Sequence, residues 1–242
     1  MKELFIRDVL NAEFGSKASE IFASSMLLQY LDMKMGAVHG DSKSRRSLAN
    51  IYAIYSILHF YLEDFFSQKK KYCKFDGYDF TKLFNFCRSL YGGSKLQNHA
   101  FNNRLNFEFK RRLPASVNDI MVSNNGKYLI HIDYLYVGDV DISKAVCDIV
   151  EKYISLLKEK DHMLITALTH IEQLKSYKDK KDAINNLLNE EAEARIFEII
   201  SYAILTNQAL RAYVWVTSGR LSCERAFVYW FFLLSARPRN FD

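Results

Sequence analysis

The stretch SLANIYAIYSILHFYLEDFFS, residues 47–67, limits the possible folds most, because it is almost entirely apolar and its side chains follow helical spacing. It predicts a largely buried helix. A second apolar stretch with helical spacing, residues 17–35, predicts another helix before it. The 242 residues include only 2 Pro and 9 Gly, which favours long helices over a sandwich of short strands. We therefore expect a mainly α-helical protein with a sizeable core.

Several classes of protein are excluded by what the sequence lacks. No stretch reaches 18 uninterrupted apolar residues, so no transmembrane helix is predicted and we expect no membrane partner. Residues 1–16 contain acids where a secretion signal would be apolar, which predicts a cytoplasmic location. The cysteines (Cys73, Cys87, Cys147 and Cys223) form no CxxC pair, so they predict reduced thiols rather than a zinc site.

The positive charge of the chain is concentrated in one segment. The net charge is +5, but residues 69–112 hold eleven cations and three acids, so this segment carries +8 and the rest carries −3. A basic segment in an otherwise slightly acidic protein indicates a polyanionic partner. The alternative is a solvated charged face.

Two helices separated by glycines are predicted inside this basic segment. Residues 79–91 have apolar side chains at steps of three and four, with Asp79 as a plausible N-cap and Gly92 or Gly93 as a left-handed stop. Ser94 then caps a second predicted helix, residues 95–106. Its polar arc contains Lys95, Asn98, His99, Asn102 and Asn103, opposite the apolar Leu96, Ala100, Phe101 and Leu105.

A β-hairpin is predicted after the second helix. Residues 106–113, NFEFKRRL, alternate like a strand, and Pro114 ends the run. Two β-rich runs then flank Asn125-Gly126, a strong hairpin signal. Helix, glycine turn, helix and hairpin follow one another in a winged helix-turn-helix, whose second helix enters the major groove of DNA.

This arrangement predicts the residues that contact double-stranded DNA. Amide side chains pair with adenine edges, and Lys or Arg pairs with guanine, whereas a carboxylate would repel phosphate. Cations on either side of the helix, and the hairpin tip at residues 124–127, would hold the DNA backbone. The predicted set is Lys69, Lys70, Lys71, Lys95, Asn98, His99, Asn102, Asn103, Lys110, Arg111, Arg112 and Lys127. The alternative is an exposed polar helix in an ordinary α-rich domain.

Residues 142–205 are predicted to be helical, in three segments separated by the charged spacers KEKDH and KSYKDKKD. The last segment ends in ARIFEIISYAIL, residues 194–205. This motif resembles the first helix of the PD-(D/E)xK nuclease core of type II restriction endonucleases. The resemblance implies sequence-specific recognition of double-stranded DNA and Mg²⁺-dependent phosphodiester cleavage, with Glu198 as a catalytic residue. It locates no metal ligands, and we also expect a homodimer.

The sequence departs from that family after Leu205. The strands that should carry the remaining acids and a lysine do not follow, since residues 206–242 contain only Glu224 and Asp242 as acids and no lysine. We therefore expect an incomplete or altered catalytic core and a foreign or frameshifted tail. The alternative for the tail is a genuine apolar C-terminal element.

The expected fold is thus mainly α with a small β-hairpin. A helical region with a winged helix-turn-helix (1–141) precedes a helical region that leads into a truncated or altered α/β nuclease core (142–205), and an atypical tail follows (206–242). Two other functions stay open: a non-enzymatic winged-helix transcriptional regulator, and a structural α-rich protein with no role on DNA.

Overall fold

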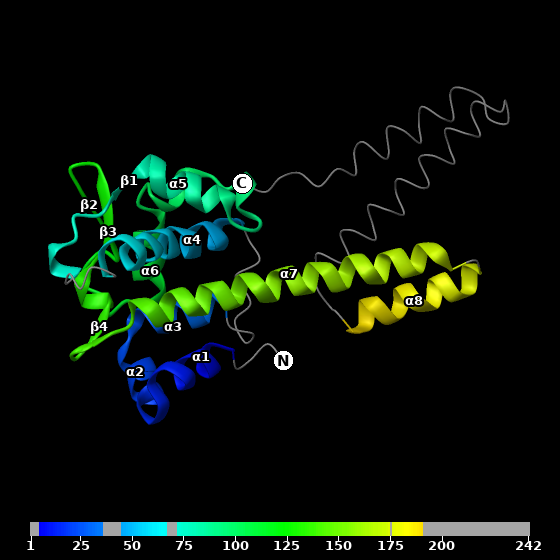
Figure 1. The fold of residues 1–242 in the computed structure, drawn as a ribbon. Coiled ribbons are helices and arrows are strands. Elements are labelled where there is room, and N and C mark those ends of the chain that lie inside the picture. Colours follow the sequence, from blue (N-terminus) through cyan, green and yellow to red (C-terminus); the bar gives the residue numbers. More distant parts are fainter. Residues whose placement is uncertain (1–4, 36–44, 67–71, 175, 191–242) are drawn as a thin grey trace, which may run out of the picture. The chain divides into compact units, whose positions relative to one another are not determined.

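The computed structural model describes residues 5–35, 45–66, 72–174 and 176–190, and this part of the chain is mainly helical with two small antiparallel sheets (Figure 1). The coarse expectation of a mainly α protein with a little β structure is therefore confirmed. The chain divides into two compact units, with the boundary after His162. The first unit contains every element up to the first part of α7, and each unit is described separately.

Three helices open the first unit: α1 (Phe5–Phe14), α2 (Ala18–Ser24) and α3 (Met26–Met35). The helix expected over residues 17–35 is present but broken at Ser25, whose backbone is extended. The Ser25 hydroxyl accepts a hydrogen bond from the Leu28 N–H at 3.2 Å, as an N-cap does. The break therefore starts a new helix in a new direction.

The central helix is α4 (Arg45–Phe60), which continues into a π-helical turn at Tyr61–Phe65. Residues 51–58 are all buried, so every face of this part of the helix contacts other elements. The prediction of a largely buried helix here is confirmed. A helix that is apolar on all sides needs elements around its whole circumference, and α3 and residues 80–89, 98–100 and 127–130 all pack against it.

Helix α5 (Phe80–Ser89) begins at the predicted cap, but it ends at Ser89, where the extended Leu90 rather than Gly92 terminates it. The Asp79 side chain accepts a hydrogen bond from the Lys82 N–H at 3.0 Å, and Gly92 has the left-handed φ of +72°. The next residue, Gly93, is buried against the end of α5, where a Cβ atom would lie 2.0 Å from the Cys87 carbonyl oxygen. Only glycine permits this close approach.

The helix predicted over residues 95–106 is wrong. The structure has two short 3₁₀ turns, Gly93–Lys95 and Asn98–Ala100, and Gln97 between them is extended. Asparagine at residues 98, 102 and 103 competes for backbone hydrogen bonds and disfavours a continuous helix. Asn103 has a φ of +66°, which also interrupts helical geometry.

The strand predicted over residues 106–113 is also wrong, because α6 (Arg104–Arg112) occupies this position. Leu105 and Phe109 are both fully buried, and their separation of four residues is helical. A short alternation of phenylalanine with polar residues fits a strand equally well by pattern alone, and burial of the Leu105–Phe109 pair decides in favour of the helix.

The larger sheet contains β1 (Tyr78–Asp79), β2 (Met121–Asn124) and β3 (Lys127–Ile130) in the antiparallel order β1-β3-β2. The hairpin predicted around Asn125-Gly126 is confirmed, and both turn residues have positive φ, +49° and +77°. That combination matches the right-handed twist of the flanking strands. A second hairpin, β4 (Tyr136–Val137) with β5 (Val140–Asp141), leads into α7.

Side chains complete the hydrogen bonding on both sides of the larger sheet. The Asn106 carboxamide accepts from the Met121 N–H and donates to the Met121 C=O, both at 2.8 Å. The Tyr72 hydroxyl accepts from the Ile130 N–H at 2.9 Å and donates to the Ile130 C=O at 2.8 Å. Met121 and Ile130 are register partners, so one rung of the hairpin is held by a side chain at each end.

Helix α7 (Ser143–Gln173) is continuous, so the break predicted at KEKDH is wrong. Lysine and glutamate are good helix formers, and a charged run need not end a helix. The spacer predicted at residues 175–182 is also too long, because α8 (Tyr177–Glu190) begins within it. Helix α8 and the last part of α7 belong to the second unit.

No helix in the described ranges is both long enough and apolar enough to cross a membrane.

Candidate nucleic-acid interface

The structure preserves the two faces predicted for residues 95–106, although it replaces the helix by 3₁₀ turns. All five residues of the polar arc, from Lys95 to Asn103, are exposed. The four apolar residues opposite them are buried, with exposed fractions between 0% and 6%. Because a 3₁₀ turn repeats every three residues, it keeps i and i+3 on one side, as a helix nearly does.

Helix α6 carries the second part of the candidate interface. Its exposed residues are Phe107, Lys110 and Arg111, and Asn103 lies exposed just before its first turn. These positions are spaced by four, three and one residues and therefore lie along one face of the helix. Two cations, an amide and an aromatic ring thus form one strip, which we call the α6 outer face.

The single carboxylate of α6 lies away from this strip. Glu108 forms an ion pair with the buried Lys34 of α3, and its other oxygen accepts from the Asn50 Nδ2 of α4 at 2.5 Å. The Asn50 Nδ2 also lies 3.2 Å from the Tyr30 hydroxyl, whose pKa is raised by burial and then by the Glu108 charge. The negative charge of α6 is therefore neutralised inside the protein. It does not reduce the positive potential of the cations on the outer face.

The inner side of α6 also positions the hairpin. The two Asn106 hydrogen bonds to Met121 fix β2 against the helix. A cavity of about 370 Å³ lies beside these bonds, and its lining includes Asn103, Asp119 and Ser123. The Phe101 ring packs edge to face on Tyr128 of β3, with 5.5 Å between ring centroids. The 3₁₀ segment, α6 and the hairpin are thus held together by direct side-chain contacts.

One acid lies beside the outer face. Asp119, in the segment before β2, forms an ion pair with Lys110 at 2.6 Å, and both side chains are nearly half exposed, 47% and 44%. An exposed pair of this kind is weak and exchanges readily with other anions. Asp119 therefore reduces the charge that Lys110 presents without burying it.

The remaining residues predicted to contact DNA differ in how exposed they are, and some lie outside the described part of the chain. Lys127 is exposed at the start of β3, next to the hairpin tip, as expected. Arg112 is half-buried at the end of α6, so it presents less of its guanidinium than Arg111 does. Lys69, Lys70 and Lys71 lie outside the described residues, and so do Glu198 and the rest of the nuclease-like helix.

Sequence reasoning missed Phe107, whose side chain is 69% exposed. The strand interpretation placed Phe107 and Phe109 on the same face, and both would then point inwards. In the helix they point in nearly opposite directions, so Phe109 enters the core and Phe107 faces solvent. The spacing of Leu105 and Phe109 was the signal that could have identified it.

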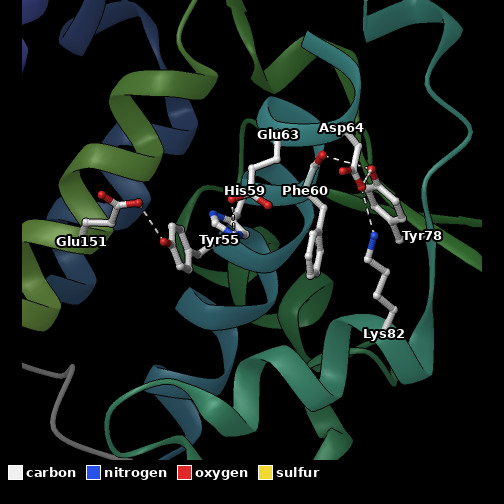
Figure 2. A network of polar contacts seen from close by, with 8 residues as sticks. All are labelled: Tyr55, His59, Phe60, Glu63, Asp64, Tyr78, Lys82 and Glu151. Atoms are coloured by element: carbon white, nitrogen blue, oxygen red, sulfur yellow. Dashed lines mark hydrogen bonds and ion pairs between the residues drawn. The ribbon is translucent and has the colours of Figure 1, made fainter. Parts of the chain in front are cut away.

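A second polar network lies at the end of α4 (Figure 2). The Asp64 carboxylate accepts from the Tyr78 hydroxyl at 2.8 Å and pairs with Lys82 at 3.0 Å, and these two bonds, in that order, lower its pKa. The Lys82 Nζ lies 4.1 Å from the centroids of both the Phe60 and Tyr78 rings. Its ammonium group is therefore held by two aromatic faces and one carboxylate.

The same network continues along α4 to α7, as Figure 2 shows. His59 stacks on Phe86 at 4.6 Å and lies 3.3 Å from Glu63, and the Tyr55 hydroxyl donates to Glu151 at 2.8 Å. Each carboxylate in the group already has a partner within the protein. The network ties α4 to β1, α5 and α7, and it has the character of a structural clamp rather than a reaction centre.

Nucleophilic and metal-binding groups are not gathered in the described part of the chain. No cluster of three or more His, Cys, Asp or Glu side chains there is arranged to hold a metal ion. Cys87 and Cys147 are buried free thiols, and burial raises the pKa of Cys87 to about 12, so this thiol is not reactive. Asp139 and Asp141 lie close together in the sequence, as metal ligands can, but the Asp141 carboxylate accepts a hydrogen bond from the Ser143 N–H at 2.8 Å and caps the first turn of α7.

Comparison of the chain with models of protein families, with curated proteins and with solved structures finds no match in any of the three.

Proposed function

We propose that the chain binds double-stranded DNA through a winged helix-turn-helix built from α4, β1, α5, α6 and the β2–β3 hairpin. The order of these elements and the strand order β1-β3-β2 support this arrangement. Helix α6 is then the helix that enters the major groove, and the hairpin is the wing. One departure is the segment between α5 and α6, residues 90–103, which is longer than the usual turn of three or four residues.

The observation that carries the proposal is the separation of charge on α6. Lys110 and Arg111 face solvent together with Asn103, whereas Glu108 is turned inwards, where Lys34 neutralises it and Asn50 donates a hydrogen bond to it. A helix whose outer face is free of its own carboxylate is suited to a phosphate-lined groove. Amide and guanidinium groups on that face are the side chains that pair with base edges.

Salt-dependent binding tests this proposal. The affinity of the purified chain for a random-sequence duplex of about 30 base pairs is measured by fluorescence anisotropy over a series of salt concentrations. We expect Arg111→Ala to weaken binding and to reduce the slope of log affinity against log salt by about one unit. Asp119→Asn frees Lys110 and is expected to strengthen binding.

The matched control is Lys17→Ala, which removes an exposed cation away from α6 and should leave the slope unchanged. A wild-type chain with no affinity for duplex DNA at low salt contradicts the proposal. So does an Arg111→Ala chain that binds like the wild type.

We further propose, from the likeness of residues 194–205 to restriction endonucleases, that the chain is an endonuclease of this kind, which would cleave its bound DNA with Mg²⁺ but whose catalytic core is incomplete or altered. Glu198 lies outside the described residues, and no metal site can be assembled from the residues described. No catalytic step is therefore derived. The competing proposal, a winged-helix regulator, rests on the same DNA-binding surface without cleavage.

Digestion of unmethylated phage DNA with Mg²⁺ at high protein excess separates these two functions. Discrete fragments that Glu198→Ala abolishes support an endonuclease. Retarded but uncut DNA supports a regulator or an incomplete enzyme, and it is the result we expect because acids and a lysine are missing after Leu205. Sedimentation of the same protein tests the expected homodimer.

A further inference from the structure

Phe107 is the feature of α6 that phosphate binding does not explain. Its side chain is 69% exposed, although it lies in the middle of a helix that buries Leu105 and Phe109. A single exposed apolar residue is common on protein surfaces and carries no argument by itself. Its setting does, because Asn103, Lys110 and Arg111 lie on the same face, within about one helical turn of it.

The charges around Phe107 limit what can cover it. A symmetric contact with a second copy, with its axis at Phe107, would bring Lys110 and Arg111 close to the same cations of the partner and would be repulsive. A membrane surface needs a broad apolar helix face, whereas α6 has already buried its other apolar residues in the core. This face matches better a polyanion that also presents an apolar group between its negative charges. Duplex DNA is such a polyanion, because its grooves lie between two phosphate backbones.

Only one group on the base edges of the major groove is apolar: the C5 methyl group of thymine. Every other feature that differs between bases there is a hydrogen-bond donor or acceptor, which a phenyl ring cannot satisfy. We propose that Phe107 reads the C5 methyl group of a thymine in the recognition sequence, while Lys110 and Arg111 hold the flanking phosphates or guanine. This inference rests on the proposed function, in which α6 enters the major groove.

The test removes the methyl group from the DNA and the ring from the protein. Sequences that bind the wild-type chain are first selected from a random duplex library. Each conserved thymine is then replaced by deoxyuridine, which lacks only the methyl group. At one thymine position in the site we expect wild-type affinity to fall about fourfold, the effect of losing one buried methyl contact. Phe107→Ala should bind the thymine and uracil duplexes equally.

Val117→Ala is the matched control, because it removes another exposed apolar side chain, 85% exposed and outside α6, and should keep the discrimination. Circular dichroism of both variants checks that they fold as the wild type does. If the wild type selects no sequence and binds no duplex, both this inference and the proposed function fail. If it binds and selects a sequence but ignores the methyl group, or if Phe107→Ala discriminates as strongly as the wild type, only this inference fails.

Discussion

Two ion pairs hold neighbouring parts of the first unit in different ways. Lys34–Glu108 joins α3 to α6 in the interior, where the two side chains are only 1% and 16% exposed. Lys82–Asp64 joins α5 to the end of α4 at the surface, with exposed fractions of 38% and 51%. The first pair is completed by Asn50, and the second by the rings of Phe60 and Tyr78 (Figure 2).

The two pairs differ in whether water can replace a charged partner that has been removed. Water can replace the partner of an exposed group, so its ion pair contributes little to folding. Lys34 is only 1% exposed, so water cannot take the place of the Glu108 carboxylate beside its ammonium group. The pair that positions the proposed DNA-binding helix is therefore the one whose disruption is most damaging.

The largest expected effect comes from Glu108→Ala. It leaves the Lys34 ammonium buried without its carboxylate, so we expect the free energy of unfolding to fall by about 3–5 kcal/mol, measured by urea denaturation. The double variant Lys34→Met/Glu108→Leu fills similar volume without charge and should recover most of the loss. If Glu108→Ala is as stable as the wild type, the buried pair contributes no more to folding than the exposed pair does.

A smaller effect is expected from Lys82→Met, which keeps most of the apolar stem but removes the ammonium from between the two rings. The free energy of unfolding should fall by about 1 kcal/mol, from the lost contacts with the aromatic faces and Asp64. Lys82→Arg preserves the charge and should lose less. If Lys82→Met lowers the free energy of unfolding as much as Glu108→Ala does, the Lys82–Asp64 pair is shielded from water and the comparison fails.

The smallest effect is expected from Asp64→Asn, about 0.5 kcal/mol at neutral pH. Tyr78 and Lys82 lower the pKa of Asp64 in the folded protein, so its contribution is present above the unfolded pKa and is lost as the pH falls through the folded pKa. The difference between wild type and variant should therefore shrink as denaturation is repeated at progressively more acidic pH. A difference that does not change with pH would show that the Asp64 charge is not what stabilises the clamp.

The sequence predicted those parts of the fold that depend on neighbouring residues. The Asp79 cap, the left-handed Gly92 and the Asn125-Gly126 turn each require a particular backbone geometry that few residues provide. The buried helix α4 was also predictable, because its apolar residues cover a length that no strand would reach. Each of these features can be predicted from a short stretch of sequence, without knowing how the rest of the chain folds.

The parts that could not be predicted depend on contacts between distant segments. Lys34 and Glu108 are 74 positions apart, and nothing near either residue indicates that they form a pair. The secondary structure of residues 95–112 was misassigned because short polar segments fit a helix, a 3₁₀ turn or a strand almost equally well. Packing of Leu96, Phe101 and Leu105 into the core decides among them. The exposed side of residues 95–103 was predicted correctly for Lys95, Asn98, His99, Asn102 and Asn103, but the exposed Phe107 was missed.

The Asn106 carboxamide has a consequence for the behaviour of the protein at high concentration. Strand β2 is at the edge of its sheet, and Asn106 occupies the N–H and C=O of Met121 that would otherwise be open. Open groups on an edge strand recruit strands from other molecules and start aggregation. Any change that loosens α6 from the sheet, including loss of the Glu108 pair, should therefore leave the edge of β2 open to pairing with other molecules, and precipitation should accompany the loss of the proposed DNA binding.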